Sequence, residues 1–194
     1  MSELALQRIA ENKAKHARGE DARRLDLGNC GLTEVPEEIK DCTWLQILIL
    51  RGNQNIESLE PIKRLTNLWQ LDIPYTSIGD LSPVREFENL EVLKCQHTPV
   101  KDLLPLKNLK RLRKLNLCFT QVEDLSPILH LMRRGIRVRW GQWGFSDTIS
   151  IDSGLKYPPV EIARQGTSAI LRYFEDLEKQ GNDQIYEAKA ILIG

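Results

Sequence analysis

The chain has 194 residues, and its 27 lysine and arginine residues balance 27 aspartate and glutamate residues, so the formal net charge is zero. A balanced charge excludes a global attraction to nucleic acid or to an anionic membrane, and the length fits one long solenoid or one to two compact domains. No apolar run reaches a membrane span, and the first residues lack the basic and apolar regions of a signal peptide. The four cysteines form no C-x-x-C pair, which favours small buried side chains in a reducing cytoplasm over disulfides or a zinc site.

Residues 1–20 are predicted to hold a helix. Ser2 is placed to cap it, and its apolar contacts would come from Leu4, Leu6, Ile9 and Ala10. We expect this helix to cover one end of the structure that follows.

Residues 21–157 are dominated by a repeated phrase. Three copies open at Leu68, Leu90 and Leu112, spaced 22 residues apart, and each has further apolar residues at the fourth and sixth positions. Two earlier copies cover residues 25–39 and 45–56, the second with one extra residue in the turn that leaves its strand. This is the leucine-rich repeat pattern. It predicts an α/β solenoid with parallel strands on the concave face and short helices or 3-10 turns on the convex face.

The ninth position of this pattern usually holds asparagine, whose amide can bridge successive turns. Here the ninth residues are Cys30, Asn53, Thr76, Thr98 and Thr120. Threonine offers one hydroxyl donor, whereas asparagine offers two amide donors and an acceptor. We therefore expect a thinner interior ladder of hydrogen bonds, and either modest stability or help from the ends.

The return segments carry the prolines expected at the first turn of a short convex helix, at Pro61, Pro83, Pro105 and Pro127. Three of them follow an aspartate that is placed to cap the turn, namely Asp80, Asp102 and Asp124.

Beyond Val122 the repeat spacing loosens. Residues 136–140 and 148–152 are predicted strands. Residues 158–181 are a predicted linker helix, because apolar residues follow three- and four-residue steps and Gly181 can end the helix. Residues 182–194 are expected to contain a short apolar strand that ends in Gly194.

Strand residues that alternate with the buried leucines should face the concave side. We predict a partner-binding face there, formed by Arg51, Asp72, Tyr75, Lys94, His97, Asn116, Phe119 and Arg139. Tyr75, His97 and Phe119 share one repeat position and should stack as a column about 5 Å apart. Two interpretations stay open for this column: contact residues for a protein partner, or rings that only pack on one another.

Charge is uneven along the chain. From Lys107 to Arg139 there are nine basic residues against two acidic ones, a balance of +7. An acidic protein face, a phosphate or a nucleic acid are candidate ligands, and a solvated flank is the alternative. No RNA-stacking or helix-turn-helix signature supports nucleic acid. His16, His97 and His130 lie in different segments, so no catalytic site is predicted.

Four stretches resemble the amino-terminal part of Roco proteins: residues 1–6, 25–33, 157–174 and 187–194. That family joins leucine-rich repeats to a Ras-like GTPase domain, called Roc, and to a COR dimerisation domain. The resemblance implies that residues 187–194 are the first strand of the GTPase domain, with Gly194 as the first glycine of its loop G-x-x-x-x-G-K-[ST]. The chain stops there, so no cofactor is expected in it, while GTP and Mg are expected in a longer parent protein.

The leading hypothesis is a protein-interaction and sensor arm that regulates the GTPase domain of the same chain. The alternative is a free-standing adaptor that binds a protein on its concave face. A nucleic-acid binder is the least favoured hypothesis. In each case the chain is not an enzyme and needs no membrane.

Overall fold

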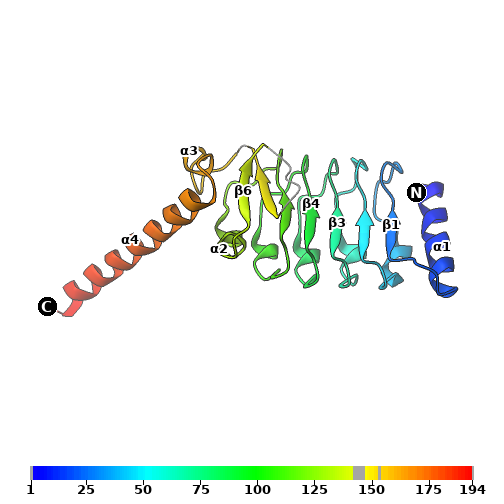
Figure 1. The fold of residues 1–194 in the computed structure, drawn as a ribbon, viewed down its shortest axis with the longest axis horizontal. Helices are drawn as coiled ribbons and strands as arrows, with labels where there is room; N and C mark the ends of the chain where they lie inside the picture. The colour runs from blue at the N-terminus through cyan, green and yellow to red at the C-terminus, as the bar shows by residue number, and fades with distance from the viewer. Residues whose placement is uncertain (1, 142–146, 153, 194) are drawn as a thin grey trace.

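The computed structural model describes residues 2–141, 147–152 and 154–193, with side chains described up to residue 181. Figure 1 shows the strands side by side in one long array, with α1 across one end and α4 running away from the other. The α-helices are α1 (Glu3–Ala17), α2 (Leu129–Arg133), α3 (Val160–Ala163) and α4 (Thr167–Ile193).

The strands are short and lie on the concave side. They are β1 (Arg24–Asp26), β2 (Ile47–Ile49), β3 (Gln70–Asp72), β4 (Val92–Lys94), β5 (Lys114–Asn116), β6 (Arg137–Trp140) and β7 (Thr148–Ile151). The return segments form 3-10 helices on the opposite side: η1 (Glu37–Asp41), η2 (Glu60–Ile62), η3 (Ser82–Val84), η4 (Leu104–Leu106) and η5 (Ser126–Ile128). The predicted solenoid fold is therefore confirmed.

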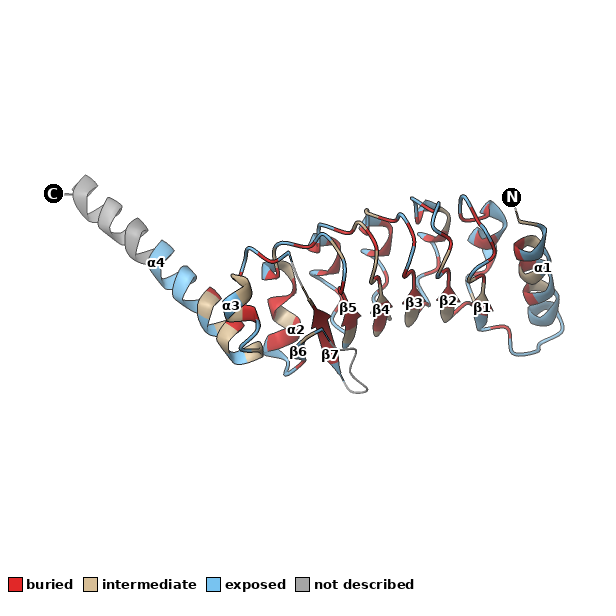
Figure 2. Ribbon diagram, turned by 90° about the horizontal axis from the view of Figure 1, so that it is seen from above, coloured by how far each residue is buried: buried red, intermediate tan, exposed pale blue. Residues whose placement is uncertain are grey.

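The core is a stack of leucines that repeats with the strands. Leu48, Leu71, Leu93 and Leu115 pair in register across neighbouring strands and have no exposed surface. Buried residues lie between the strands and the convex turns along the whole array (Figure 2). A single turn cannot bury its own apolar side, so each turn depends on the next.

The last two strands exchange places relative to their sequence order. In the described residues the sheet has seven parallel strands in the order β1-β2-β3-β4-β5-β7-β6. All four residues of β7 are buried, whereas Arg137 and Arg139 of β6 are exposed. Two arginines need water and fit an edge strand, while the small polar residues Thr148 and Ser150 fit the interior of the sheet.

The interior hydrogen bonds differ between asparagine and threonine repeats as predicted. Asn53 Oδ1 accepts from the amides of Cys30 and Leu32 at 3.1 and 3.0 Å. Asn53 Nδ2 donates to the carbonyls of Leu27 and Leu50 at 2.9 and 2.7 Å. One side chain thus joins the first two turns through three bonds and makes a fourth, to Leu50, within its own turn.

Each threonine instead bonds only within its own turn. The hydroxyls of Thr76, Thr98 and Thr120 donate to the carbonyl three residues earlier, at 2.8, 2.5 and 2.7 Å. The side-chain ladder is therefore thinner in the later repeats, and backbone and apolar contacts hold those turns together.

The predicted aspartate caps are present on the convex side. Asp80, Asp102 and Asp124 accept from the amides two residues on, at 2.8, 2.8 and 2.7 Å. Ser2 differs from its prediction: its carbonyl accepts from Ala5 and Leu6, but its side chain makes no capping bond. The start of α1 is thus closed by its backbone alone.

Helix α1 covers the open edge of β1 through polar side chains. The buried Asn12 donates to the carbonyls of Ala22 and Arg24 at 2.9 and 3.0 Å, and its Oδ1 accepts from Trp44 Nε1 at 3.0 Å. Arg8 donates to the carbonyl of Asp26 at 2.9 Å. These bonds satisfy strand carbonyls that a further repeat would otherwise pair.

The other end is covered by α3 and α4, which are two helices where one linker helix was predicted. The helical conformation is interrupted at Gly166, whose φ of +91° lies in the left-handed region that favours glycine. Thr167 then accepts a hydrogen bond from the Val138 amide on β6, 2.8 Å from its Oγ1. Gly181 does not end the helix, because α4 continues to Ile193.

The predicted strand over residues 187–194 is wrong for its described part, which belongs to α4. A strand needs a neighbour for its backbone groups, and the only free sheet edge at this end is covered by α3 and α4. A helix satisfies its backbone groups internally. Gly194, the predicted nucleotide-loop glycine, lies outside the described residues.

Asn53→Thr should destabilise the fold by about 3 kcal/mol, because three buried backbone groups lose their partner. The matched control is Thr98→Val, which removes one bond within a single turn and should cost about 1 kcal/mol. Urea unfolding of the two variants checks the difference. Equal destabilisation would contradict the bridging role of Asn53.

Candidate partner-binding site

The concave face presents parallel rows of side chains, one residue from each strand. The strand register aligns one row as Asp26, Ile49, Asp72, Lys94, Asn116, Ser150 and Arg139. Arg139 therefore lies one strand further from Asn116 than the repeat spacing suggests, because β7 separates β5 from β6.

Tyr75, His97 and Phe119 form a continuous stack just beyond the ends of β3, β4 and β5. The ring centroids of Tyr75 and His97 are 4.3 Å apart with planes at 13°, and those of His97 and Phe119 are 4.2 Å apart at 14°. Tyr75 is 51% exposed and Phe119 is 61% exposed. The stacked geometry matches the column predicted from the repeat spacing.

Each ring of the column belongs to a residue in the left-handed region, with φ of 57°, 56° and 57°. The same position in the first two repeats holds Asn29 at 53° and Gly52 at 73°. Glycine and asparagine adopt this conformation readily, whereas a bulky residue there costs roughly 1–2 kcal/mol. The three rings therefore occupy a backbone conformation that favours smaller residues.

Two predicted site residues form the floor of the face and contribute little surface. Asp72 pairs with Lys94 at 2.7 Å, and the Asp72 side chain is only 8% exposed. Gln70 Nε2 donates to the second Asp72 oxygen at 3.1 Å. Asn116 is also buried, and its Oδ1 accepts from the Cys118 amide at 3.0 Å.

The remaining predicted residues reach further into solvent. The exposed ones are Arg51, Tyr75, Phe119 and Arg139, while Lys94 and His97 are half-buried.

Gln96 is a candidate that the sequence analysis did not select. Its carbonyl accepts from the Tyr75 amide at 3.2 Å, which ties it to the column. Its side-chain Oε1 is buried, and among the described residues it has no hydrogen-bond partner. Neighbouring repeats hold unrelated residues at this position, so no sequence pattern selects it.

The cysteines are interior side chains, and two of them are shown to have strongly raised thiol pKa values. All are free and buried. Burial raises the pKa of Cys95 to about 12 and that of Cys118 to about 11. Protonated thiols in apolar surroundings behave as small hydrophobic side chains.

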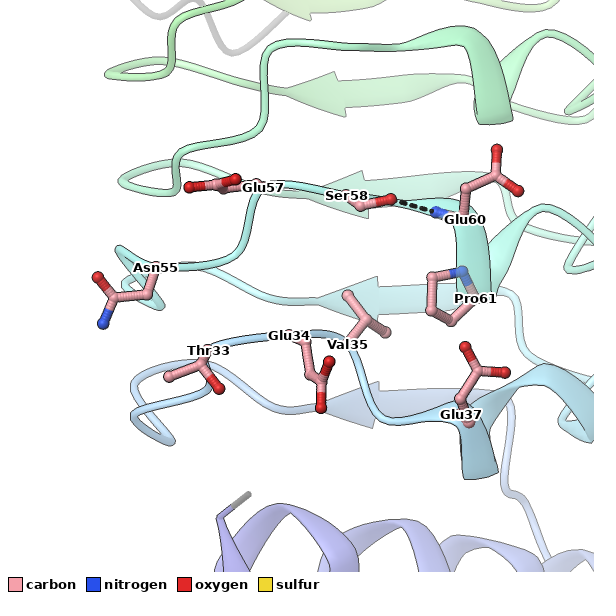
Figure 3. Close-up of a pocket in the computed structure, with 9 residues that line it drawn as sticks. All are labelled: Thr33, Glu34, Val35, Glu37, Asn55, Glu57, Ser58, Glu60 and Pro61. Carbon is pink, nitrogen blue, oxygen red and sulfur yellow. Dashed lines mark hydrogen bonds between the residues drawn. The ribbon is translucent and has the colours of Figure 1, made fainter.

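A separate hollow on the first two repeats is lined by glutamates (Figure 3). Glu37 pairs with Lys40 at 3.5 Å, and Glu60 pairs with Lys63 at 2.8 Å. In the part of the chain that the structure describes, no three His, Cys, Asp or Glu side chains are grouped as metal ligands. The hollow is an acidic surface without a ligand set.

Comparisons with known proteins agree with this architecture. A family profile described as leucine-rich repeats, two copies, matches residues 88–130. No curated protein sequence matches the chain. Residues 88–130 match the leucine-rich repeat family, and the chain has the leucine-rich repeat solenoid fold, an architecture whose extended surface commonly binds other proteins.

Two solved structures from Listeria monocytogenes str. 4b F2365 are similar. Internalin C2 is 30% identical over 56% of this chain and 47% of its own, with a TM-score of 0.54. Internalin F is 21% identical over 62% of this chain and 33% of its own, with a TM-score of 0.51, which shows the fold alone. The chain thus spans less than half of either internalin chain.

No described helix has both the length and the apolar composition needed to cross a membrane.

The three histidines lie in three different environments. His16 stacks on Trp44 at 3.8 Å, and His97 is the middle ring of the column. His130 lies in α2, where its Nε2 is buried and lacks a partner in the described residues. Burial lowers the pKa of His130 more than nearby carbonyls raise it.

Stability should fall as the pH drops below about 6.5, the ordinary histidine value, toward the lower pKa of folded His130. In that window the unfolded chain binds more protons than the folded one, so acid favours unfolding. His130→Leu should flatten this part of the dependence of melting temperature on pH. His16→Gln, on an exposed helix face, is the control and should leave the slope in place. An unchanged slope in His130→Leu would refute the assignment.

Proposed function

We propose that the concave face captures a protein partner, with the stacked column of Tyr75, His97 and Phe119 as its main contact. The observation that carries this proposal is a stack of three rings in left-handed backbone conformations, of which Tyr75 and Phe119 are more than half exposed. Aromatic side chains are enriched among residues that dominate binding energy.

The double variant Tyr75→Asn with Phe119→Asn tests whether the column contributes to partner binding without being needed for folding stability. Asparagine suits the left-handed conformation, as Asn29 does, so the melting temperature should stay constant or rise. Affinity for the partner should fall at least about tenfold, because two contact residues are removed. The measurement is capture from an extract of the native cells, followed by titration of the identified protein in purified form.

Leu104→Asn is the matched control, because it removes an exposed apolar side chain, 58% exposed, from the convex side. It should leave partner affinity unchanged. If the double variant binds as well as the parent, or if it loses much of its stability, the column is a packing feature and the proposal fails.

We further propose that the chain is the sensor arm of a Roco-type GTPase, with residues 158–181 as its link to the following domain. The support is the resemblance of the linker and the attachment of α4 to the edge strand through Thr167. The predicted first strand of the GTPase domain does not support this proposal, because the described residues of that region belong to α4. A free-standing adaptor accounts for the same fold, and GTP with Mg would belong only to the longer protein.

The native reading frame beyond Gly194 distinguishes these two functions. For a Roco arm we expect G-x-x-x-x-G-K-[ST] to begin at Gly194, and partner binding to change the affinity of the whole protein for GTP. A stop codon, or a continuation without this loop, would overturn the Roco proposal in favour of the adaptor.

A further inference from the structure

We infer that the partner of the concave face is an extended acidic protein segment whose carboxylates lie against Arg137 and Arg139 of β6. The inference rests on the proposed function, since it names the chemistry of the partner for the same face.

Most basic residues of this end are engaged elsewhere. Arg113 pairs with Glu91 at 3.0 Å, and Arg133 pairs with Glu178 at 3.4 Å. The Arg134 guanidinium donates to a backbone carbonyl. Of the basic residues at this end of the chain, therefore, a ligand on the concave side can reach only a few in the described part of the structure.

Those cations are on the last strands of the sheet. Val138 is buried, so alternation places the exposed Arg137 and Arg139 on the concave side of β6. The register aligns Arg137 with Lys114 through Thr148, and Arg139 with Asn116 through Ser150. Arg137 and Arg139 are therefore the cations that these rows offer to a ligand, and within the described residues neither has an ion-pair partner. Lys114 already has a partner, and the carboxylate of Asp152, just after β7, accepts from the Phe119 amide at 2.9 Å.

The geometry of the column favours an acidic peptide over a nucleic acid. Its rings stack face to face at 4.2–4.3 Å, so both faces of His97 and one face each of Tyr75 and Phe119 are used within the column. Nucleic-acid bases bind by stacking on free ring faces. Apart from the outer faces of its two terminal rings, the column offers ring edges, which carry positive partial charge, together with the Tyr75 hydroxyl. Carboxylates and peptide carbonyls are the groups that such edges attract.

The distance along the face sets the length of the segment. Arg139 and Tyr75 belong to the first and last of five adjacent strands, β6, β7, β5, β4 and β3. Four strand spacings are about 19 Å, which an extended chain covers with roughly six residues. A segment of this length can contact both the arginines and the column.

The test is fluorescence anisotropy with a fluorescein-labelled octapeptide of alternating glutamate and tyrosine, at low and at moderate salt. The peptide should bind the parent protein, and Arg137→Gln with Arg139→Gln should weaken it at least about tenfold. The control Lys107→Gln with Lys110→Gln removes the same charge from exposed residues outside the two concave rows, and should change affinity less than about twofold. Melting curves verify that both variants fold.

Three outcomes would overturn the inference: no binding of the acidic peptide, equal weakening in the two paired variants, or tighter binding of a lysine–tyrosine octapeptide or of a single-stranded octanucleotide. The captured native partner separates the two proposals. If Tyr75→Asn with Phe119→Asn loses that partner while Arg137→Gln with Arg139→Gln retains it, the proposed function stands and the acidic chemistry is wrong.

Discussion

Closure of each turn by the next is the constraint on which the whole molecule depends. The leucine interior has no other cover, and the strand edges have no other partners once the repeats stop. Both ends solve this with a helix that brings polar side chains to an open edge: Asn12 at β1 and Thr167 at β6. Among the repeats that the structure describes, Asn53 adds an interior bridge of three bonds to the preceding turn. The covered ends are therefore as much a part of the stability of this fold as its leucines.

The eighth repeat position shows where stability and binding separate. A left-handed residue stands there in each of the five repeats from β1 to β5, where the chain bends away from the strand toward the convex side. Asn29 and Gly52 meet that requirement with little strain, whereas Tyr75, His97 and Phe119 meet it with more. Stacking of the rings offsets part of this backbone strain, because offset aromatic pairs stabilise by about 1 kcal/mol each. The terminal rings nevertheless remain more than half exposed, which packing alone does not require.

The sequence was sufficient for the solenoid, because leucine spacing reports directly which side chains are buried. It was also sufficient for the stacked column, since residues in one repeat position align across strands. It was not sufficient for the order of β6 and β7, which depends on how deeply Arg137 and Thr148 can be buried rather than on any period. The alternation of strand residues predicts that Asp72 lies on the concave side. It does not predict that Asp72 is buried in an ion pair with Lys94, because that burial depends on three-dimensional packing. The short apolar run after residue 186 fits a strand or a helix equally well, and only the presence or absence of a pairing edge decides between them.

Charge gives the concave face a direction. Its first strands carry Ile47 and Ile49, its centre is neutralised by the Asp72–Lys94 pair, and its last strands are basic. An acidic segment anchored on Arg137 and Arg139 would therefore lie next to Thr167, where α4 joins the sheet. Contact at that edge can alter how α3 and α4 pack on β6, whereas contact near β1 cannot. If the chain is followed by another domain, the end of the face with the strongest electrostatic attraction is also the end from which a change in packing reaches that domain.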